Sequence, residues 1–147
     1  MFMDSSIKIK GRCIITTLKR QNGIWVPVST NVYDNLITTV GKNLLADYIV
    51  NGISDYIATL AIGTGTTTVS ADDTEVEDEI FRISADNIAN VNNATYFYFY
   101  VSPEEANMTW GNVGLLTQSG ILVSHLNCNE TKNNSMAKNV TYTLTFS

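Results

Sequence analysis

Apolar and polar residues alternate along several short segments of the chain, the pattern of a strand with one buried and one exposed face. Thr95–Val101 shows it most plainly, because phenylalanine and valine alternate there with tyrosine. The same pattern near the C-terminus predicts an inward face made of Val140, Tyr142, Leu144 and Phe146. Shorter patterns predict further strands at residues 57–62, 80–83, 120–125 and directly after Trp110.

Residues 7–28 predict a β-hairpin that precedes the other predicted strands. Asn22-Gly23 supplies its turn, because both residues tolerate the positive φ of a tight hairpin. Pro27 has no N–H for a sheet ladder, so we expect the second strand to lie at a sheet edge. The polar segment Thr30–Asn35 predicts a loop after it.

One segment, residues 38–50, has helical periodicity. Val40, Leu44 and Tyr48 recur at intervals of four and predict a single apolar stripe. Thr38 or Thr39 can cap the start, and Asn51-Gly52 can supply the left-handed turn that ends a helix.

Together these elements predict a mainly β fold: an antiparallel β-sandwich of about seven or eight strands with one α-helix near residues 38–50. A chain of 147 residues suits a single domain over residues 1–147. Its parts are the hairpin at 7–28, the helix at 38–50 and the remaining strands within 57–146.

Composition and charge exclude several classes of function. The hydrophobic fraction of 44% and charged fraction of 16% are those of a folded protein, and a net charge of −5 without a basic run argues against direct nucleic-acid binding. The first residues lack the apolar stretch of a signal peptide, and no apolar run is long enough to span a bilayer. Cys13 and Cys128 resemble no zinc motif; we expect free, buried thiols, and a disulfide between neighbouring strands is the alternative.

The segment from Ala61 to Arg82 combines a Gly/Thr-rich stretch with a dense run of acids. It lacks the Gly-Lys-Ser/Thr of a phosphate-binding loop. A calcium site is a second interpretation, and its candidate ligands are Asp72, Asp73, Glu75 and Glu77. The spacing departs from an EF-hand loop, so we favour a solvated connection between two strands in which Arg82 pairs with one carboxylate.

Residues suited to catalysis are sparse. The single histidine, His125, follows Ser124 in a strand, where the two side chains point to opposite faces. Glu104 and Glu105 are adjacent and do not have the separation that paired carboxylates need for sugar hydrolysis. We therefore expect no enzymatic activity and no cofactor; a hydrolase built around His125 is the alternative.

Tyr96, Tyr98 and Tyr100 share one face of the predicted strand at 95–101. If exposed, they would form an amphipathic strip suited to protein contacts or to stacking on sugar rings. The interpretation we favour is that they cover one face of the sandwich beneath other elements, such as the helix.

Several short motifs follow one another between residue 35 and the C-terminal strand. They are Asn35-Leu-Ile-Thr38 with Gly41, Ile62-Gly-Thr-Gly-Thr-Thr67, Asp73-Thr-Glu-Val-Glu-Asp-Glu-Ile-Phe-Arg82, Asn112-Val-Gly-Leu-Leu116 and Thr131-Lys132. Their joint order resembles a group of small bacteriophage virion proteins found among tail, tail-fibre and baseplate genes. Asn112 stands where that group usually carries a glutamate, and we expect it to accept backbone N–H bonds in a turn with its neutral carbonyl.

The resemblance implies a structural protein of the virion, assembled in the host bacterial cytoplasm. Its expected partners are other virion proteins and further copies of itself, with a host-surface receptor as a further possibility and no membrane contact. The alternatives are a capsid decoration or head-fibre protein, and a receptor- or carbohydrate-binding module. The candidate contact residues are Thr66, Thr67, Asp72, Asp73, Tyr96, Tyr98, Tyr100 and Trp110.

Overall fold

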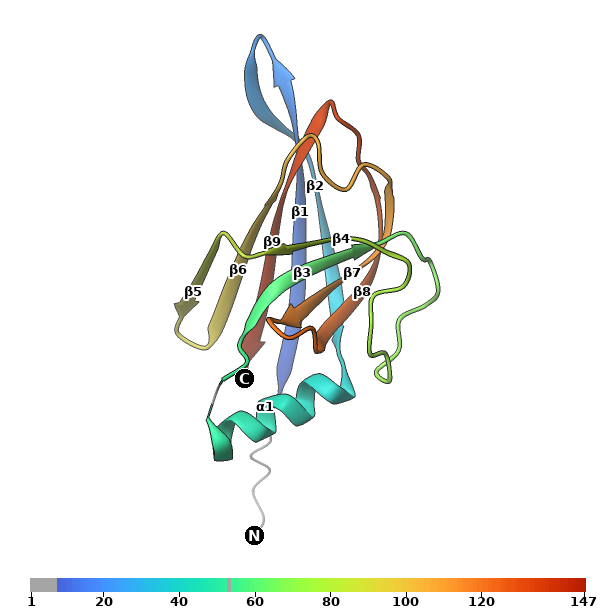
Figure 1. The fold of residues 1–147 in the computed structure, drawn as a ribbon. Coiled ribbons are helices and arrows are strands. Elements are labelled where there is room, and N and C mark those ends of the chain that lie inside the picture. The colour runs from blue at the N-terminus through green and yellow to red at the C-terminus, as the bar shows by residue number, and fades with distance from the viewer. Residues whose placement is uncertain (1–7, 53) are drawn as a thin grey trace.

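The computed structural model describes residues 8–52 and 54–147. This part of the chain forms nine strands and one helix (Figure 1). In chain order they are β1 (Ile9–Gln21), β2 (Ile24–Ile37), α1 (Thr39–Asn51), β3 (Ile57–Gly63), β4 (Glu79–Ser84), β5 (Asn87–Val91), β6 (Ala94–Val101), β7 (Thr109–Thr117), β8 (Leu122–Thr131) and β9 (Met136–Phe146).

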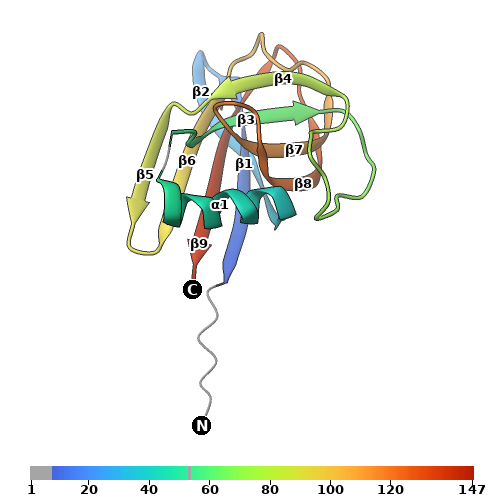
Figure 2. The same ribbon diagram turned by 60° about the horizontal axis from the view of Figure 1, so that its bottom comes forward.

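All strands belong to one antiparallel sheet in the order β4-β3-β7-β8-β2-β1-β9-β6-β5. The sheet curls, so that its two end strands, β4 and β5, are joined by only two residues, Ala85 and Asp86 (Figures 1 and 2). The N–H of Ala85 donates to the Ala58 carbonyl at 2.7 Å and that of Asp86 to the Tyr98 carbonyl at 2.8 Å. The two halves of the sheet are thereby held around one core, which confirms the mainly β antiparallel fold with a single helix.

The core draws on both halves of the curled sheet. Phe97 and Phe99 of β6 and Tyr142 of β9 pack with Leu60 of β3 and Leu115 of β7. The inward faces predicted for β6 and β9 are confirmed, with Phe146 only half-buried. Strand β7 is buried from its second residue to its last, so its outer face is covered as well as its core face.

The N-terminal hairpin has the predicted turn, with φ of 53° at Asn22 and 80° at Gly23. The prediction of a loop at Thr30–Asn35 is wrong, because these residues continue β2 and pair with β1.

Strand β2 pairs with β8 only at Leu36 and Ile37. Over its remaining length β2 pairs with β1 alone, and we call this part of β2 with the β1 residues opposite it the arm. Strand β1 pairs in turn with β9 as far as Lys19, so only the hairpin tip, residues 20–25, projects beyond the rest of the sheet (Figure 1).

Side chains replace the missing backbone pairing between β2 and β8. Glu130 of β8 is buried and accepts a hydrogen bond from Asn31 Nδ2 at 2.7 Å and another from the Tyr33 hydroxyl. Its other oxygen pairs with Lys138 Nζ at 2.9 Å, and Lys138 also donates to Thr17 Oγ1 at 2.8 Å. These polar contacts fix the base of the arm to the body, and each charge has a partner, as burial requires.

The helix begins one residue later than predicted. The Thr38 side chain accepts the Gly41 N–H at 3.0 Å and donates to the Leu122 carbonyl at 2.6 Å, which joins the start of α1 to β8. Gly52 ends the helix with φ of 74°.

The helix crosses one end of the sheet (Figure 2). Only Gly41 is fully buried in α1, and the predicted apolar stripe of Val40, Leu44 and Tyr48 is half-buried. No helix in the described residues is long and apolar enough to cross a membrane.

Candidate functional site

Residues 64–78, called here the acidic loop, connect β3 to β4 as predicted. The loop covers the outer face of β7 and β8, and Val76 from the loop packs on Ala61, Leu116 and Leu122 of the sheet. Its backbone approaches β7 closely, because a Cβ at Gly111 would lie 2.2 Å from the Gly65 carbonyl oxygen. A connection without secondary structure is therefore held as a defined surface.

Asn112 on β7 makes the most bonds to the acidic loop and is 1% exposed. Its Oδ1 accepts the Glu77 N–H at 3.0 Å, as expected for an anchor at this position. Its Nδ2 donates to the carbonyls of Gly65 at 3.0 Å and Glu77 at 2.9 Å. These donors and acceptors fix the orientation of the amide, which a carboxylate could not reproduce because it has no N–H.

His125 on β8 lies beside Asn112 and is 3% exposed. Its Nε2 is 2.8 Å from Asn112 Oδ1, and its Nδ1 is 2.8 Å from Asp73 Oδ2. Since Asn112 Oδ1 is an acceptor, Nε2 carries the proton. An imidazolium paired with the Asp73 carboxylate satisfies both contacts at once.

Asp73 has a second donor in the acidic loop. The Ser70 N–H donates to Asp73 Oδ2 at 2.8 Å. Burial raises the pKa of Asp73, but the bonds from Ser70 and His125 outweigh it, so the net pKa lies below the usual value. Asn127, two residues after His125 on the same strand face, accepts the Val69 N–H at 2.9 Å and donates to the Thr67 carbonyl at 2.9 Å.

This arrangement places the loop and does not present His125 to a substrate. Both ring nitrogens are committed to Asp73 and Asn112. Ser124 points to the opposite face of β8, where its hydroxyl is 2.9 Å from that of Tyr142. Sequence reasoning missed the joint role of His125 and Asn127, although polar residues alternating on one face of an apolar strand are a recognisable signal.

The carboxylates of the acidic loop do not converge. In the described residues no group of three or more His, Cys, Asp or Glu side chains is placed to hold a metal ion. Glu77 accepts the Thr67 hydroxyl at 3.0 Å, while Asp72 and Glu75 are exposed. Arg82 pairs with a carboxylate as predicted, donating to both oxygens of Glu79 at 2.9 and 2.7 Å.

The other candidate contact residues separate into exposed and buried groups. Thr66 and Thr67 are exposed on the acidic loop. Tyr98 and Tyr100 are 39% and 42% exposed on the outer face of β6, so the expectation that other elements cover them is wrong. Trp110 is fully buried and donates to the Ala106 carbonyl at 2.9 Å, which makes it a core residue and corrects its choice as a contact residue.

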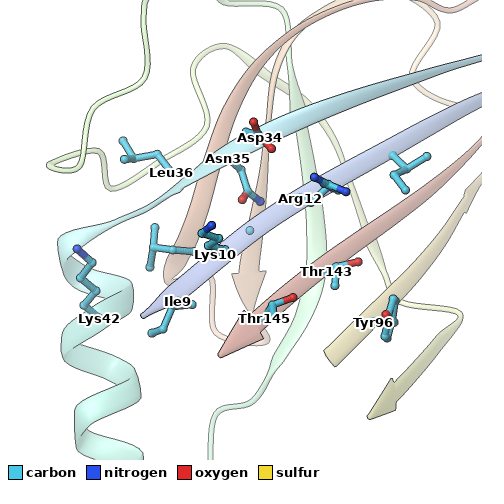
Figure 3. Close-up of a pocket in the computed structure, with 13 residues that line it drawn as sticks. Ile9, Lys10, Arg12, Asp34, Asn35, Leu36, Lys42, Tyr96, Thr143 and Thr145 are labelled. Atoms are coloured by element: carbon cyan, nitrogen blue, oxygen red, sulfur yellow. The ribbon is translucent and has the colours of Figure 1, made fainter. Parts of the chain in front are cut away.

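A groove of about 870 Å³ lies along the outer face of β1, bounded by β2, β9, β6 and the first turns of α1 (Figure 3). Lys10 and Arg12 of β1 and Lys42 of α1 contribute its cations, and we call it the cationic groove. Its opposite side carries Thr143 and Tyr96 (Figure 3). The alternation of Lys10 and Arg12 on one strand face is visible in the sequence, but Lys42 joins them only through the fold.

Both cysteines are free, as predicted. Cys13 is buried and Cys128 half-buried. Burial raises the pKa of both thiols, that of Cys128 to about 12. Neither is therefore activated as a nucleophile.

Comparisons of the chain with protein-family models, with curated proteins and with solved structures gave no match.

Proposed function

We propose that this chain is a structural protein of a bacteriophage virion, most closely associated with the tail or tail fibre, which assembles into an oligomer and joins other virion proteins. The class comes from the order of the sequence motifs. The exposed arm formed by β1 and β2 supports the assembly.

The arm is the single observation on which an assembly role rests. Ile24 is 66% exposed, and Val28 and Val32 on the same strand are also exposed. In the described part of the chain, β2 has no partner strand on its second edge before Leu36. Exposed apolar side chains on a half-paired strand are typical of a surface that another polypeptide covers. Pro27 and the adjacent bulge limit unregulated pairing.

The motif residues also have structural rather than chemical contacts. Asn112 and Asp73 hold the acidic loop. Buried Lys132 donates to Asn107 Oδ1 at 2.7 Å and to the Pro103 carbonyl at 3.2 Å, which orders the connection between β6 and β7. Because these side chains hold loops in place through hydrogen bonds, they favour a structural protein over an enzyme.

A receptor- or carbohydrate-binding module is the second candidate, and the exposure of Tyr98 and Tyr100 favours it. The rings of Tyr96 and Tyr98 are stacked, with centroids 6.4 Å apart and an angle of 12° between their planes. A capsid decoration or head-fibre protein would use the same contacts as a tail protein.

Size-exclusion chromatography with light scattering, with and without EDTA, tests the proposal. We expect one discrete oligomer with the same mass under both conditions. The double variant Ile24→Ser/Val32→Ser removes apolar surface from the arm and is expected to reduce that mass, whereas Ile49→Ser, at an exposed position of α1, serves as the matched control. A wild-type monomer at every concentration would contradict the proposal.

A further inference from the structure

We propose that the cationic groove binds the acidic loop of a second copy of this chain; this contact rests on the proposed assembly function and specifies its surfaces. Three of the nine Lys and Arg residues line the groove, while five of the fourteen Asp and Glu residues lie in the acidic loop, between Asp72 and Asp78. Opposite charge is thus concentrated on two separate surfaces of a chain whose net charge is −5.

The cations of the groove belong to no ion pair among the described residues. The ion pairs among residues 8–52 and 54–147 are Arg82–Glu79, His125–Asp73 and Lys138–Glu130. None of them includes Lys10, Arg12 or Lys42. Figure 3 shows Lys10 and Arg12 on β1 and Lys42 on α1, with Asp34 as the acidic residue among those that line the groove. An anionic occupant is therefore the complementary one.

The acidic loop supplies such an occupant in a fixed form. Asp72 and Glu75 are exposed and belong to no ion pair among the described residues, while Asn112, His125 and Asn127 hold the loop backbone on the sheet. Docking a loop that is already ordered loses less conformational entropy than ordering a flexible one. A volume of about 870 Å³ lies within the range of roughly 300–1,000 Å³ found for binding sites, enough to receive a loop tip.

Because groove and loop are different surfaces, each copy can offer its loop to one neighbour and its groove to another. Such a head-to-tail contact generates a ring when the rotation closes. An acidic glycan could use the same cations, but the chain itself carries the matching anion in a preformed shape, which favours the second copy.

Reciprocal charge reversal tests this contact. The groove variant is Lys10→Glu/Arg12→Glu, and the loop variant is Asp72→Lys/Glu75→Lys; all four side chains are exposed, so folding is expected to be retained. The control, Asp47→Lys/Glu104→Lys, makes the same change of charge as the loop variant at exposed positions outside the loop, the groove and the arm. Light scattering gives the mass of each protein alone and of the groove and loop variants mixed in equal amounts. The wild type and each variant are also assayed for binding to polysialic acid.

We expect each variant alone to associate on the order of a hundredfold more weakly than wild type, because like charges then face each other. The mixture is expected to regain the wild-type mass, since each variant then complements the other, and the control to behave as wild type. Oligomers unchanged in both variants would overturn the groove contact and leave the proposed function standing, whereas a monomeric wild type would overturn both. Loss of polysialic acid binding in the groove variant with unchanged assembly would assign the groove to a glycan instead.

Discussion

Replacing Asn112 by leucine tests whether β7 holds the acidic loop. Leucine has nearly the same volume but removes four hydrogen bonds, three to loop backbone groups and one to His125. The three bonds to the loop break when it opens, whereas the bond to His125 lies within the sheet. At a net value of about 1 kcal/mol for each of the three, opening of the loop becomes easier by about 3 kcal/mol. Since 1.4 kcal/mol is about a factor of ten, hydrogen exchange of the loop amides should accelerate on the order of a hundredfold.

Hydrogen exchange followed by mass spectrometry measures this directly on peptides covering residues 64–78. Amides of β9 should keep their protection in Asn112→Leu, which separates loop opening from global unfolding. Asn139→Leu, at an exposed position of β9, is the matched control and should leave the loop unchanged. Wild-type protection of the loop in Asn112→Leu would refute the role assigned to this side chain.

Three further predictions concern other buried or titrating groups. Lys138→Met should lower the free energy of unfolding by about 3–5 kcal/mol in denaturant titration, because it leaves Glu130 buried without its cation. The double variant Lys138→Met/Glu130→Gln should recover part of the lost stability. If the losses of stability of the two single variants simply add in the double variant, the two side chains do not act as a pair. The pKa of Asp73 is lower in the folded protein than the usual carboxyl pKa near 3.9, so its ionised form stabilises the closed loop above that pH, and this stabilisation is lost as the pH falls through the folded pKa. Protection of the loop amides from hydrogen exchange should therefore fall below about pH 4, and Asp73→Asn should remove that pH dependence. Protection that does not change with pH in the wild type would contradict the role of Asp73. The burial and raised pKa values of Cys13 and Cys128 predict that both thiols are alkylated slowly at pH 8 in the folded protein and fast after denaturation. Rapid alkylation of Cys13 in the folded protein would contradict its burial.

Elements with a strong local pattern could be predicted from the sequence, and elements specified by distant contacts could not. Alternation located β6 and β9, and the Thr38 cap with Gly52 located α1 to within one residue. Strand β5 was missed because its five residues include two asparagines and are mostly exposed, which leaves no alternating signal.

Residues 30–35 of β2 were mistaken for a loop for a related reason. They pair with β1 on one edge only and are mostly exposed, so their strand conformation comes from pairing with β1 and not from a hydrophobic pattern. The apolar stripe of α1 was predicted correctly from its spacing, since Val40, Leu44 and Tyr48 are half-buried where the helix crosses the end of the sheet.

The candidate surfaces were only partly accessible to sequence reasoning. The acidic loop was correctly predicted as a connection, and Asn112 as an anchor for backbone N–H groups. Contacts of Asn112 with His125 depend on the register of β7 against β8, and the placement of Lys42 beside β1 depends on where α1 crosses the sheet. Neither can be derived from local spacing.

Quantitative mass spectrometry of phage particles, purified from a lysate in which this chain is expressed, tests the proposed virion role most directly. A virion structural protein that assembles into a symmetric oligomer should be present in the particles at a fixed ratio to the major capsid protein, and its copy number should be a multiple of the number of subunits in the oligomer measured in solution. Presence of the chain in the infected-cell lysate together with its absence from purified particles would contradict the account.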